Sequence, residues 1–301
     1  MDQDRDLVLG KTTVLMAENG GKYPDGNSLL VQGTEQTVLI DPSVGLVNRQ
    51  HSLPRVDRIL HSHCHEDHFA GSFLFQEKPW HFHEYDAPSI KSLDALMEFY
   101  GYPAHIDKPW RQKVVTDFNF TSCLHPVPFR DGDIFELGDC EIRVIHLPGH
   151  TPGHSAFHIF PDDVLYLGDI ELSSFGPYYG DACSDLITFE NSLRLVHDIP
   201  AKYYATFHHI GVLDRSSFEK RLRQFVEKIK SRESELLSFL SEPRTVDEVV
   251  DHRFVFRPGD ELIYIDAVER YSMCQHIDRL VAVGKVCSTQ DGRFIKIDPT
   301  S

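Results

Sequence analysis

Short apolar runs separated by turn residues fill much of the first two thirds of the chain. Runs of this length, bounded by glycine, proline, asparagine or aspartate, are typical of strands. They predict strands over residues 12–16, 27–31, 36–40, 56–60, 134–137, 141–147 and 156–160. Residues 89–100 differ, because their apolar positions recur at the spacing of one helix face. Strands and helices that alternate in this way favour a layered fold.

The last third of the chain has the pattern of helices. Apolar residues at helical spacing predict a long amphipathic helix over about residues 217–241. A capping box between Ser216 and Glu219 would begin this helix. Another helix is expected to open over residues 243–248, and a third over residues 276–285 ends at a glycine.

A hairpin is expected after these helices. Two short strands, 286–288 and 294–297, flank a turn that contains Gly292. Helices followed by a small hairpin resemble a winged-helix module. The chain therefore divides into a larger domain over residues 1–213 and a helical, winged-helix-like module over residues 214–301.

The acidic charge is concentrated in the first of these parts. The 301 residues carry a net charge of −16. Residues 214–301 hold 15 of the 30 basic and 16 of the 46 acidic side chains, which leaves a net charge of −15 for residues 1–213. Polyanions bind through basic surface, so nucleic acid is disfavoured as a partner and a small-molecule substrate is favoured. The basic face of the long helix is better explained as a face exposed to solvent or as a contact surface in a homodimer.

Two features of the chain bear on its location. The first six residues are acidic and lack the apolar core of a signal peptide. No apolar run approaches the roughly 20 residues that span a bilayer. We therefore expect a cytoplasmic location by default and no membrane partner.

Residues 61–71 concentrate side chains that bind metals. The pattern H-x-H-x-D-H, which follows an apolar run, is formed by His63, His65, Asp67 and His68. Imidazoles this close repel one another when protonated, and burying them unpaired is costly. Divalent metal ions remove both problems, because they bind neutral imidazole nitrogens and carboxylate oxygens.

The spacing of this pattern favours two ions. Residues two apart on a loop can face one ion, so His63 and His65 form a pair. Asp67 and His68 are adjacent and must diverge, so they would begin a second site close by. Two neighbouring ions are the arrangement that two-metal hydrolytic sites require.

Later strand ends supply further candidate ligands. His150 and His154 lie in a turn rich in glycine and proline, Asp169 ends an apolar strand, and His208 and His209 end another. Repeated delivery of histidine or aspartate to strand ends is hard to ascribe to chance. His154 is better explained as a residue that supports the ligands.

This ordered set resembles the metallo-β-lactamase-fold hydrolases, and the match covers about residues 10–213. That family carries H-x-H-x-D-H, then a Pro-Gly-His turn, a Gly-Asp at a strand end and a late histidine. The resemblance implies an α/β (α+β) fold, a four-layer αββα sandwich that holds two divalent metal ions. It also implies the ligands: His63, His65 and His150 for the first ion, Asp67, His68 and the late histidine for the second, and Asp169 as the bridge.

Two adjacent residues compete for the place of the late histidine. The run Thr206-Phe-His208 resembles the family's sequence at this strand end and favours His208. The Gly211-Val-Leu that follows fits His209 about as well. We prefer His208 and keep His209 as the alternative.

The ligand set and the resemblance predict a hydrolase that uses a metal-bound hydroxide. Zinc is the expected metal, although manganese or iron also suits these ligands. Asp67 is in addition a candidate catalytic residue, because it can accept a proton. Tyr178 and Tyr179 are candidate donors to a substrate carbonyl, because they follow Asp169 closely.

A small thioester, ester or lactone is the favoured substrate. A hydroxyacylglutathione hydrolase in the narrow sense is less favoured, because the Cys-Gly-His-Glu-Tyr usual near its last ligand is missing. Two alternatives remain open. One is an RNA-processing nuclease of the same fold, and the other is a persulfide-dioxygenase-like oxidoreductase with one iron.

Overall fold

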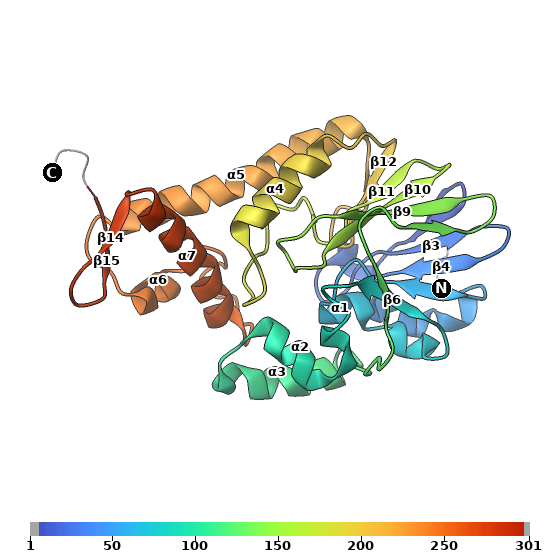
Figure 1. Cartoon of the computed structure of the whole chain (residues 1–301), viewed down its shortest axis with the longest axis horizontal. Helices are drawn as coiled ribbons and strands as arrows, with labels where there is room; N and C mark the ends of the chain where they lie inside the picture. The colour runs from blue at the N-terminus through green and yellow to red at the C-terminus, as the bar shows by residue number, and fades with distance from the viewer. Residues whose placement is uncertain (1–5, 298–301) are drawn as a thin grey trace.

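The computed structural model describes residues 6–297 and contains two β-sheets packed face to face (Figure 1). Residues 1–5, which entered the expectation about the N-terminus, lie outside the described part. The first sheet runs in sequence order, antiparallel from β1 to β4 and parallel from β4 to β7. Its strands are β1 (Leu7–Leu9), β2 (Thr12–Leu15), β3 (Ser28–Gln32), β4 (Thr37–Ile40), β5 (Arg58–Leu60), β6 (Trp80–His83) and β7 (Val127–Phe129).

The second sheet has the order β13-β12-β11-β10-β9-β8, and β11 and β12 are its parallel pair. Its strands are β8 (Ile134–Glu136), β9 (Glu141–His146), β10 (Ser155–Phe160), β11 (Val164–Tyr166), β12 (Tyr203–Ala205) and β13 (Val212–Leu213). Apolar residues of both inner faces, such as Leu29 and Ile40 from the first sheet and Ile142 and Phe157 from the second, form one buried cluster. This cluster is the middle of the sandwich.

Helices cover both outer faces. α1 (Glu66–Phe69), α2 (Leu93–Tyr100) and α3 (Ala104–Thr116) share a buried cluster with the outer face of the first sheet. α4 (Leu186–His197) and the first half of α5 (Arg215–Phe239) share another with the second sheet. Within residues 6–297, five short 3-10 helices lie in the connections: Glu18–Gly21, Val44–Asn48, Gln50–Ser52, Ser72–Phe75 and Ser89–Lys91. The four-layer αββα prediction is therefore confirmed.

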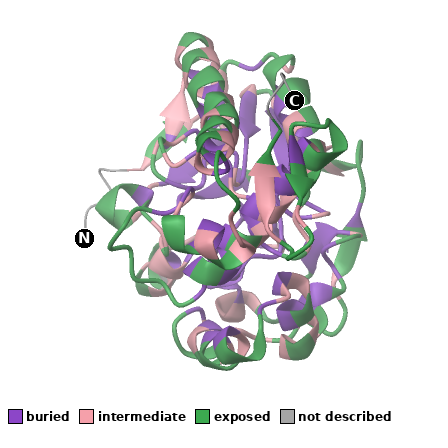
Figure 2. Cartoon of the chain, turned by 90° about the vertical axis from the view of Figure 1, so that its left-hand side faces the viewer, coloured by how far each residue is buried: buried purple, intermediate pink, exposed green. Residues whose placement is uncertain are grey.

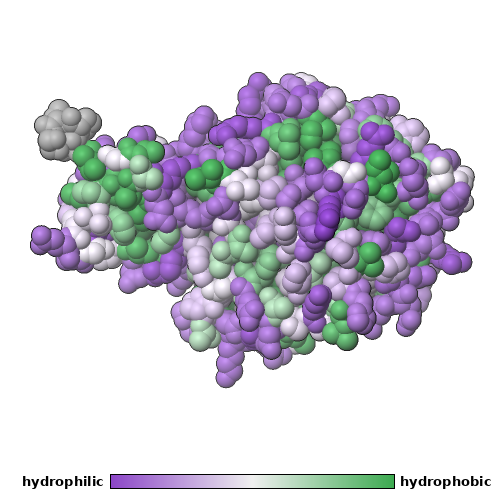
Figure 3. All heavy atoms as spheres, in the orientation of Figure 1, coloured by the Kyte–Doolittle hydropathy of each residue, from purple (hydrophilic) through white to green (hydrophobic). Residues whose placement is uncertain are grey.

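Burial follows these layers. Figure 2 shows exposed and intermediate residues on the outer helices and buried residues inside the molecule. Figure 3 shows a face that is hydrophilic over most of its area, with smaller apolar patches between. Within residues 6–297, no helix is long and apolar enough to cross a membrane.

All seven predicted strands are present, with ends shifted by up to two residues. Among the described residues, four strands were not predicted: β1, β6, β7 and the two-residue β13. All four residues of β6 are buried, so this strand lacks the alternation that marks a half-buried strand. β7 contains Pro128, which reads as a turn residue.

The long helix α5 begins differently from the prediction. Asp214 is its N-cap and accepts a hydrogen bond from the backbone N–H of Ser217 at 2.7 Å, so the predicted capping box at Ser216 and Glu219 is wrong. The Glu219 carboxylate instead pairs with Arg215 at 2.6 Å. Because the helix starts at residue 215, Glu219 lies too far along it to reach the cap.

Beyond α5 the chain forms α6 (Val246–His252), α7 (Ile265–Ala282) and the hairpin β14 (Val286–Ser288) and β15 (Phe294–Lys296). The helix from residue 243 and the hairpin were predicted. The helix expected over 276–285 is only the second half of α7, because its first half is buried on several sides and lacks a simple apolar stripe. The winged-helix likeness and the boundary at residue 213 stay predictions.

We predict that Phe218→Ala lowers the free energy of unfolding by about 3–5 kcal/mol. Phe218 is fully buried, and its ring stacks on Tyr204 of β12 at 3.9 Å between centroids, so the change removes packing between α5 and the second sheet. Urea unfolding measures the loss. Lys220→Ala, on the exposed side of the same helix, should change stability by less than about 0.5 kcal/mol. A similar small loss in both variants would show that α5 is not part of the core.

Candidate metal centre

The H-x-H-x-D-H run leaves the end of β5 and enters α1. His63 and His65 lie on the connecting loop, and Asp67 and His68 lie in α1. All four side chains are buried, with 6% exposure or less. A strand before the loop and a packed helix after it hold these side chains in place.

The other three ligand candidates come from ends of strands in the second sheet. His150 lies in the turn between β9 and β10, Asp169 follows β11 and His208 follows β12. The turn at His150 requires Gly149, whose φ is +122° and whose Cβ would lie 2.3 Å from the backbone nitrogen of Phe189. The structure thus brings all seven predicted ligands together at one edge of the sandwich.

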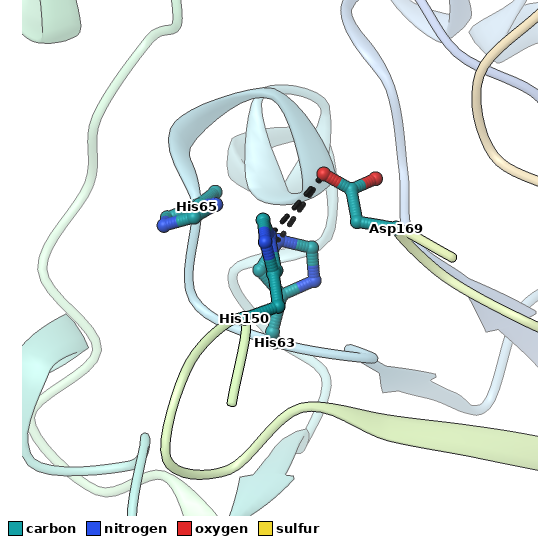
Figure 4. Close-up of side chains that lie close together, drawn as sticks. All are labelled: His63, His65, His150 and Asp169. Atoms are coloured by element: carbon teal, nitrogen blue, oxygen red, sulfur yellow. Dashed lines mark hydrogen bonds and ion pairs between the residues drawn. The ribbon is translucent and has the colours of Figure 1, made fainter. Parts of the chain in front are cut away.

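The first group consists of His63, His65, His150 and Asp169, and their ligating atoms lie within 4.8 Å of one another. Figure 4 shows His63 and His65 on one loop, with His150 and Asp169 brought close to them from two others. The Nε2 atoms of His63 and His150 are 3.1 Å apart. They lie 3.9 and 3.3 Å from Oδ2 of Asp169.

The hydrogen bonds of these two histidines fix their tautomers. Nδ1 of His150 lies 2.9 Å from the carbonyl oxygen of Tyr178, which only accepts, so this nitrogen carries the proton. Nδ1 of His63 lies 3.0 Å from Oγ of Ser62, whose proton goes to Asp41, so this Nδ1 also donates. Both Nε2 atoms therefore present lone pairs to each other at 3.1 Å. Such a contact fits a shared metal ion, which accepts both lone pairs.

The second group consists of Asp67, His68 and His208. Nδ1 of His68 donates to Oδ2 of Asp41 at 2.8 Å, and Nδ1 of His208 donates to the carbonyl oxygens of Gly21 and Asp25 at 3.1 and 3.0 Å. Their Nε2 atoms therefore point to the carboxylates. Nε2 of His208 lies 2.9 Å from Oδ2 of Asp67.

Asp169 lies between the two groups. Its Oδ2 faces the first group, and its Oδ1 lies 2.9 Å from Nε2 of His68 and 3.8 Å from Nε2 of His208. His154 orients this carboxylate, because its Nε2 accepts the backbone N–H of Asp169 at 3.1 Å while Nδ1 donates to the carbonyl oxygen of Leu147 at 3.0 Å. His154 thus has the supporting position expected from the sequence.

His65 has a carboxylate partner that the sequence analysis missed. Oδ2 of the buried Asp181 lies 3.0 Å from Nε2 of His65. The other oxygen of Asp181 accepts the hydroxyls of Tyr102 and Tyr178, at 2.8 and 3.1 Å. A carboxylate on one ring nitrogen leaves Nδ1 of His65 as the ligating atom.

Charge and burial set the protonation of these groups. Burial, together with the neighbouring His68 and His150, lowers the pKa of His63 well below its usual value, which suits a neutral ligand. Burial also lowers the pKa of His208, but Asp169 and Asp67 outweigh it and raise the pKa to about 9. The carboxylates therefore favour positive charge here, and a divalent ion can supply it in place of a proton.

Asp41 is a second residue that the sequence analysis missed. It lies directly before Pro42, is fully buried and has a φ of +46°. Its carboxylate accepts the N–H and hydroxyl of Ser62 at 2.7 and 2.5 Å, Nδ1 of His68 at 2.8 Å and the hydroxyl of Tyr166 at 2.7 Å. Asp41 therefore orients a ligand of each group, His68 directly and His63 through Ser62. Its position at the end of β4 was the one available signal.

Five of the seven candidate ligands line a cavity with a volume of about 470 Å³: His65, Asp67, His150, Asp169 and His208. Its walls are mostly aromatic: Tyr23, Tyr100, Tyr102, Trp110, Phe175, Tyr178, Phe256 and Tyr264. Tyr100 lies on α2, Tyr102 between α2 and α3, and Trp110 on α3, so the helices that cover the first sheet also form part of this wall. Glu66 also faces the cavity and accepts hydroxyls of Tyr23 and Tyr100, and burial together with Asp67 raises its pKa to about 7.

The two candidate substrate tyrosines differ. Tyr178 lines the cavity, but its hydroxyl proton goes to Asp181, which leaves only an accepting oxygen for a substrate. Tyr179 is fully buried, and its hydroxyl contacts His276 at 2.9 Å and Arg232 at 3.2 Å, so the expected substrate contact of Tyr179 is wrong. Adjacent residues in this extended segment point to opposite sides, which explains why only one reaches the cavity.

The two candidates for the last ligand also differ. His208 is buried and belongs to the second group. The side chain of His209 is 37% exposed, and its nearest carboxylate oxygen, on Glu171, is 3.9 Å away. The geometry supports His208, and its role as a ligand stays a prediction.

Comparisons with known proteins match this geometry. A model of the metallo-beta-lactamase superfamily matches residues 23–216. The chain is 26% identical over 216 residues to the acyl-coenzyme A thioesterase MBLAC2 of Bos taurus, covering 62% of this chain and 76% of that protein. It is 30% identical over 113 residues to a hydroxyacylglutathione hydrolase of Rhizobium etli, covering 37% and 43%.

Solved structures extend the likeness to the C-terminal helices. A metallo-beta-lactamase family protein from Thermus thermophilus superposes with a TM-score of 0.72 at 22% identity, covering 95% of this chain and 99% of that one. At this identity the likeness concerns the fold alone. The uncovered 5% is too short to contain α5 and α7, so the fold that the two chains share includes C-terminal helices.

We predict that His208→Ala lowers the metal content by about one ion per chain, whereas His209→Ala leaves it unchanged. Only His208 points to Asp67 and is buried in the second group. Elemental analysis after dialysis measures the content, and the adjacent histidine serves as the matched control. If only His209→Ala loses metal, then His209 and not His208 is the last ligand.

Asp41→Asn should weaken metal binding by roughly 10- to 100-fold, because the amide cannot accept four donors and orients His68 less well. Competition with a chromogenic chelator measures the affinity. Asp57→Asn is a suitable control, because that carboxylate accepts a backbone N–H from Thr37, far from the ligands in the first sheet. Equal affinities in the two variants would show that Asp41 serves folding alone.

Proposed function

This chain belongs to the metallo-beta-lactamase superfamily and is a metallohydrolase of it, and from that premise we propose that it hydrolyses small acyl thioesters with two bound zinc ions. The observation that carries the proposal is that residues of both ligand groups line one aromatic-walled cavity. Two relatives support a thioester as the bond cleaved. One is named an acyl-coenzyme A thioesterase, and the substrate named for the other, hydroxyacylglutathione, is also a thioester.

Under this proposal each group of side chains holds one ion. The first would be held by His63, His65 and His150, the second by Asp67, His68 and His208, and Asp169 lies between the two groups, where it could contribute to both. Divalent ions at these positions supply a Lewis acid and lower the pKa of water toward 7. The donor set fits, because neutral imidazoles and carboxylates are zinc ligands and the facing lone pairs of His63 and His150 need a cation.

The chain's own residues have three tasks. Asp41 and His154 fix the orientation of the ligands through their hydrogen bonds, and the Asp181 carboxylate lies 3.0 Å from Nε2 of His65. Asp67 would be ionised, and so able to accept a proton from the attacking water on a carboxylate oxygen, because His68 and His208 outweigh burial and lower its pKa. The aromatic walls exclude water and bind the apolar part of the substrate.

The charge of the cavity supports a small substrate. Beyond the ligands, Glu66, Glu171, Asp260 and Glu261 line it, against a single lysine, Lys22. Phosphate backbones bind through clusters of lysine and arginine, so an RNA substrate is disfavoured. A thioester needs no such cluster.

We expect about two zinc ions per purified chain and faster cleavage of thioesters than of the matched oxygen esters and lactones. Thiol release follows the reaction. His63→Ala and Asp169→Ala should each lose metal and roughly 100-fold or more in kcat/KM. His105→Ala, which removes an exposed histidine on α3, should match the parent.

Three outcomes would contradict the proposal. Full activity in the ligand variants would show that the reaction takes place at another site of the protein. A preference for esters or lactones would agree with a hydrolase but contradict a thioester as its substrate. One iron per chain with oxygen consumption would instead support the persulfide-dioxygenase-like alternative.

A further inference from the structure

The segment 254–264, between α6 and α7, lines the cavity although it follows the last ligand candidate by more than 40 residues. It contributes to the lining with Phe256, Asp260, Glu261, Leu262 and Tyr264. Part of the substrate site therefore comes from the C-terminal helices. Figure 1 shows the start of α7 directed toward α2 and the catalytic sandwich.

One buried carboxylate holds this segment. Glu269 lies in α7 and is fully buried. Its oxygens accept three consecutive backbone N–H groups, from Phe254 at 3.1 Å, Val255 at 3.0 Å and Phe256 at 2.8 Å. Among the described residues no basic side chain pairs with it, so these donors carry the stabilisation of its charge. Charge-assisted bonds of this kind are about twice as strong as neutral ones.

The anchored backbone carries Phe256, and the ring centroid of Phe256 lies 6.5 Å from that of Tyr264, the other ring of the wall. Phe256 lies 5.5 Å from Phe175 between ring centroids, and Phe175 belongs to the loop after Asp169. Tyr264 lies 5.0 Å from Trp110 in an edge-to-face contact and 6.2 Å from Tyr102 in a stacked one. Aromatic rings at these separations attract one another, so a displaced backbone would disturb several of them.

Glu269 is not needed to cap α6, because α6 has a capping box of its own. Thr245 and Glu248 form a capping box at the start of α6, and neither residue lines the cavity. Glu269 instead reaches back from the next helix to the chain that follows α6. Its bonds end at Phe256, the first cavity residue of the segment.

We infer that Glu269 is a positioning residue of the substrate site, which holds Phe256 and Tyr264 as the wall that recognises an apolar, preferentially aromatic, acyl group. This inference rests on the proposed thioester hydrolysis. Contacts of this wall with the acyl group affect substrate binding and not the rate of bond cleavage. Loss of the anchor should therefore raise KM for substrates that reach the wall and leave kcat nearly unchanged.

The test compares phenylacetyl and acetyl thioesters of N-acetylcysteamine, which share one neutral thiol. Glu269→Gln keeps the size of the side chain but turns an amide NH₂ toward backbone donors. We expect KM for the phenylacetyl thioester to rise by about tenfold, with less than about a twofold change for the acetyl thioester and an unchanged metal content. Phe256→Ala, which removes the ring itself, should give the same selective rise.

The matched control is Glu248→Gln. It removes a carboxylate that also accepts a backbone N–H, from Thr245 at 2.7 Å, in the same part of the chain. Stability should change little, because glutamine also accepts this N–H in a capping box, and KM should not become selective. Glu269→Asp keeps the charge but shortens the side chain, which moves the oxygens away from the backbone donors. A smaller selective rise in KM is therefore expected. This variant tests the inference if Glu269→Gln does not fold.

A fluorescence measurement tests the wall without activity. The chain has two tryptophans, so Trp80→Phe leaves Trp110, which is 1% exposed and packs against Tyr264. In this background Glu269→Gln or Glu269→Asp should make Trp110 more accessible to acrylamide, and Glu248→Gln should not. If no thioester is hydrolysed, the proposed function fails while this result still decides the role of Glu269. Unchanged quenching in a folded variant, or an equal rise in KM for both thioesters, would overturn the inference.

Discussion

Two imidazole lone pairs that face each other at 3.1 Å, on His63 and His150, are the contact on which the rest of the site depends. They cannot donate to each other, since each ring has already committed its proton to Ser62 or Tyr178. Burial removes the water that would otherwise solvate them. The arrangement is stable with a cation between the rings, and the protein must hold the rings in place until the cation binds.

The sandwich provides that rigidity. Every ligand follows the end of a strand, and the strand ends meet at one edge because the two sheets pack face to face. Buried carboxylates then fix the rings: Asp41 holds His68 and Asp181 faces His65. The positions of these carboxylates are as demanding as those of the ligands, because they choose which nitrogen is left to bind the metal.

The ligands could be predicted from sequence because each belongs to a short local pattern, a strand followed by histidine or aspartate. The same reasoning failed for Asp41 and Asp181, whose partners lie 27 and 116 residues away. It failed for Tyr179 because a one-residue difference in an extended segment reverses the direction of the side chain. Strands with an alternating or compact apolar run were predicted, whereas β6, buried on both faces, gave no periodic signal.

The C-terminal helices separate selectivity from reactivity. The ligands lie on strand ends that cannot shift without disturbing the metal site, but Phe256 and Tyr264 lie on a connection between helices that reaches the same cavity. A connection can change length and side chains more freely than a strand end. Substrate recognition can therefore change within this fold while the metal centre stays the same. Similarity to a distant relative consequently says more about the bond cleaved than about the acyl group bound.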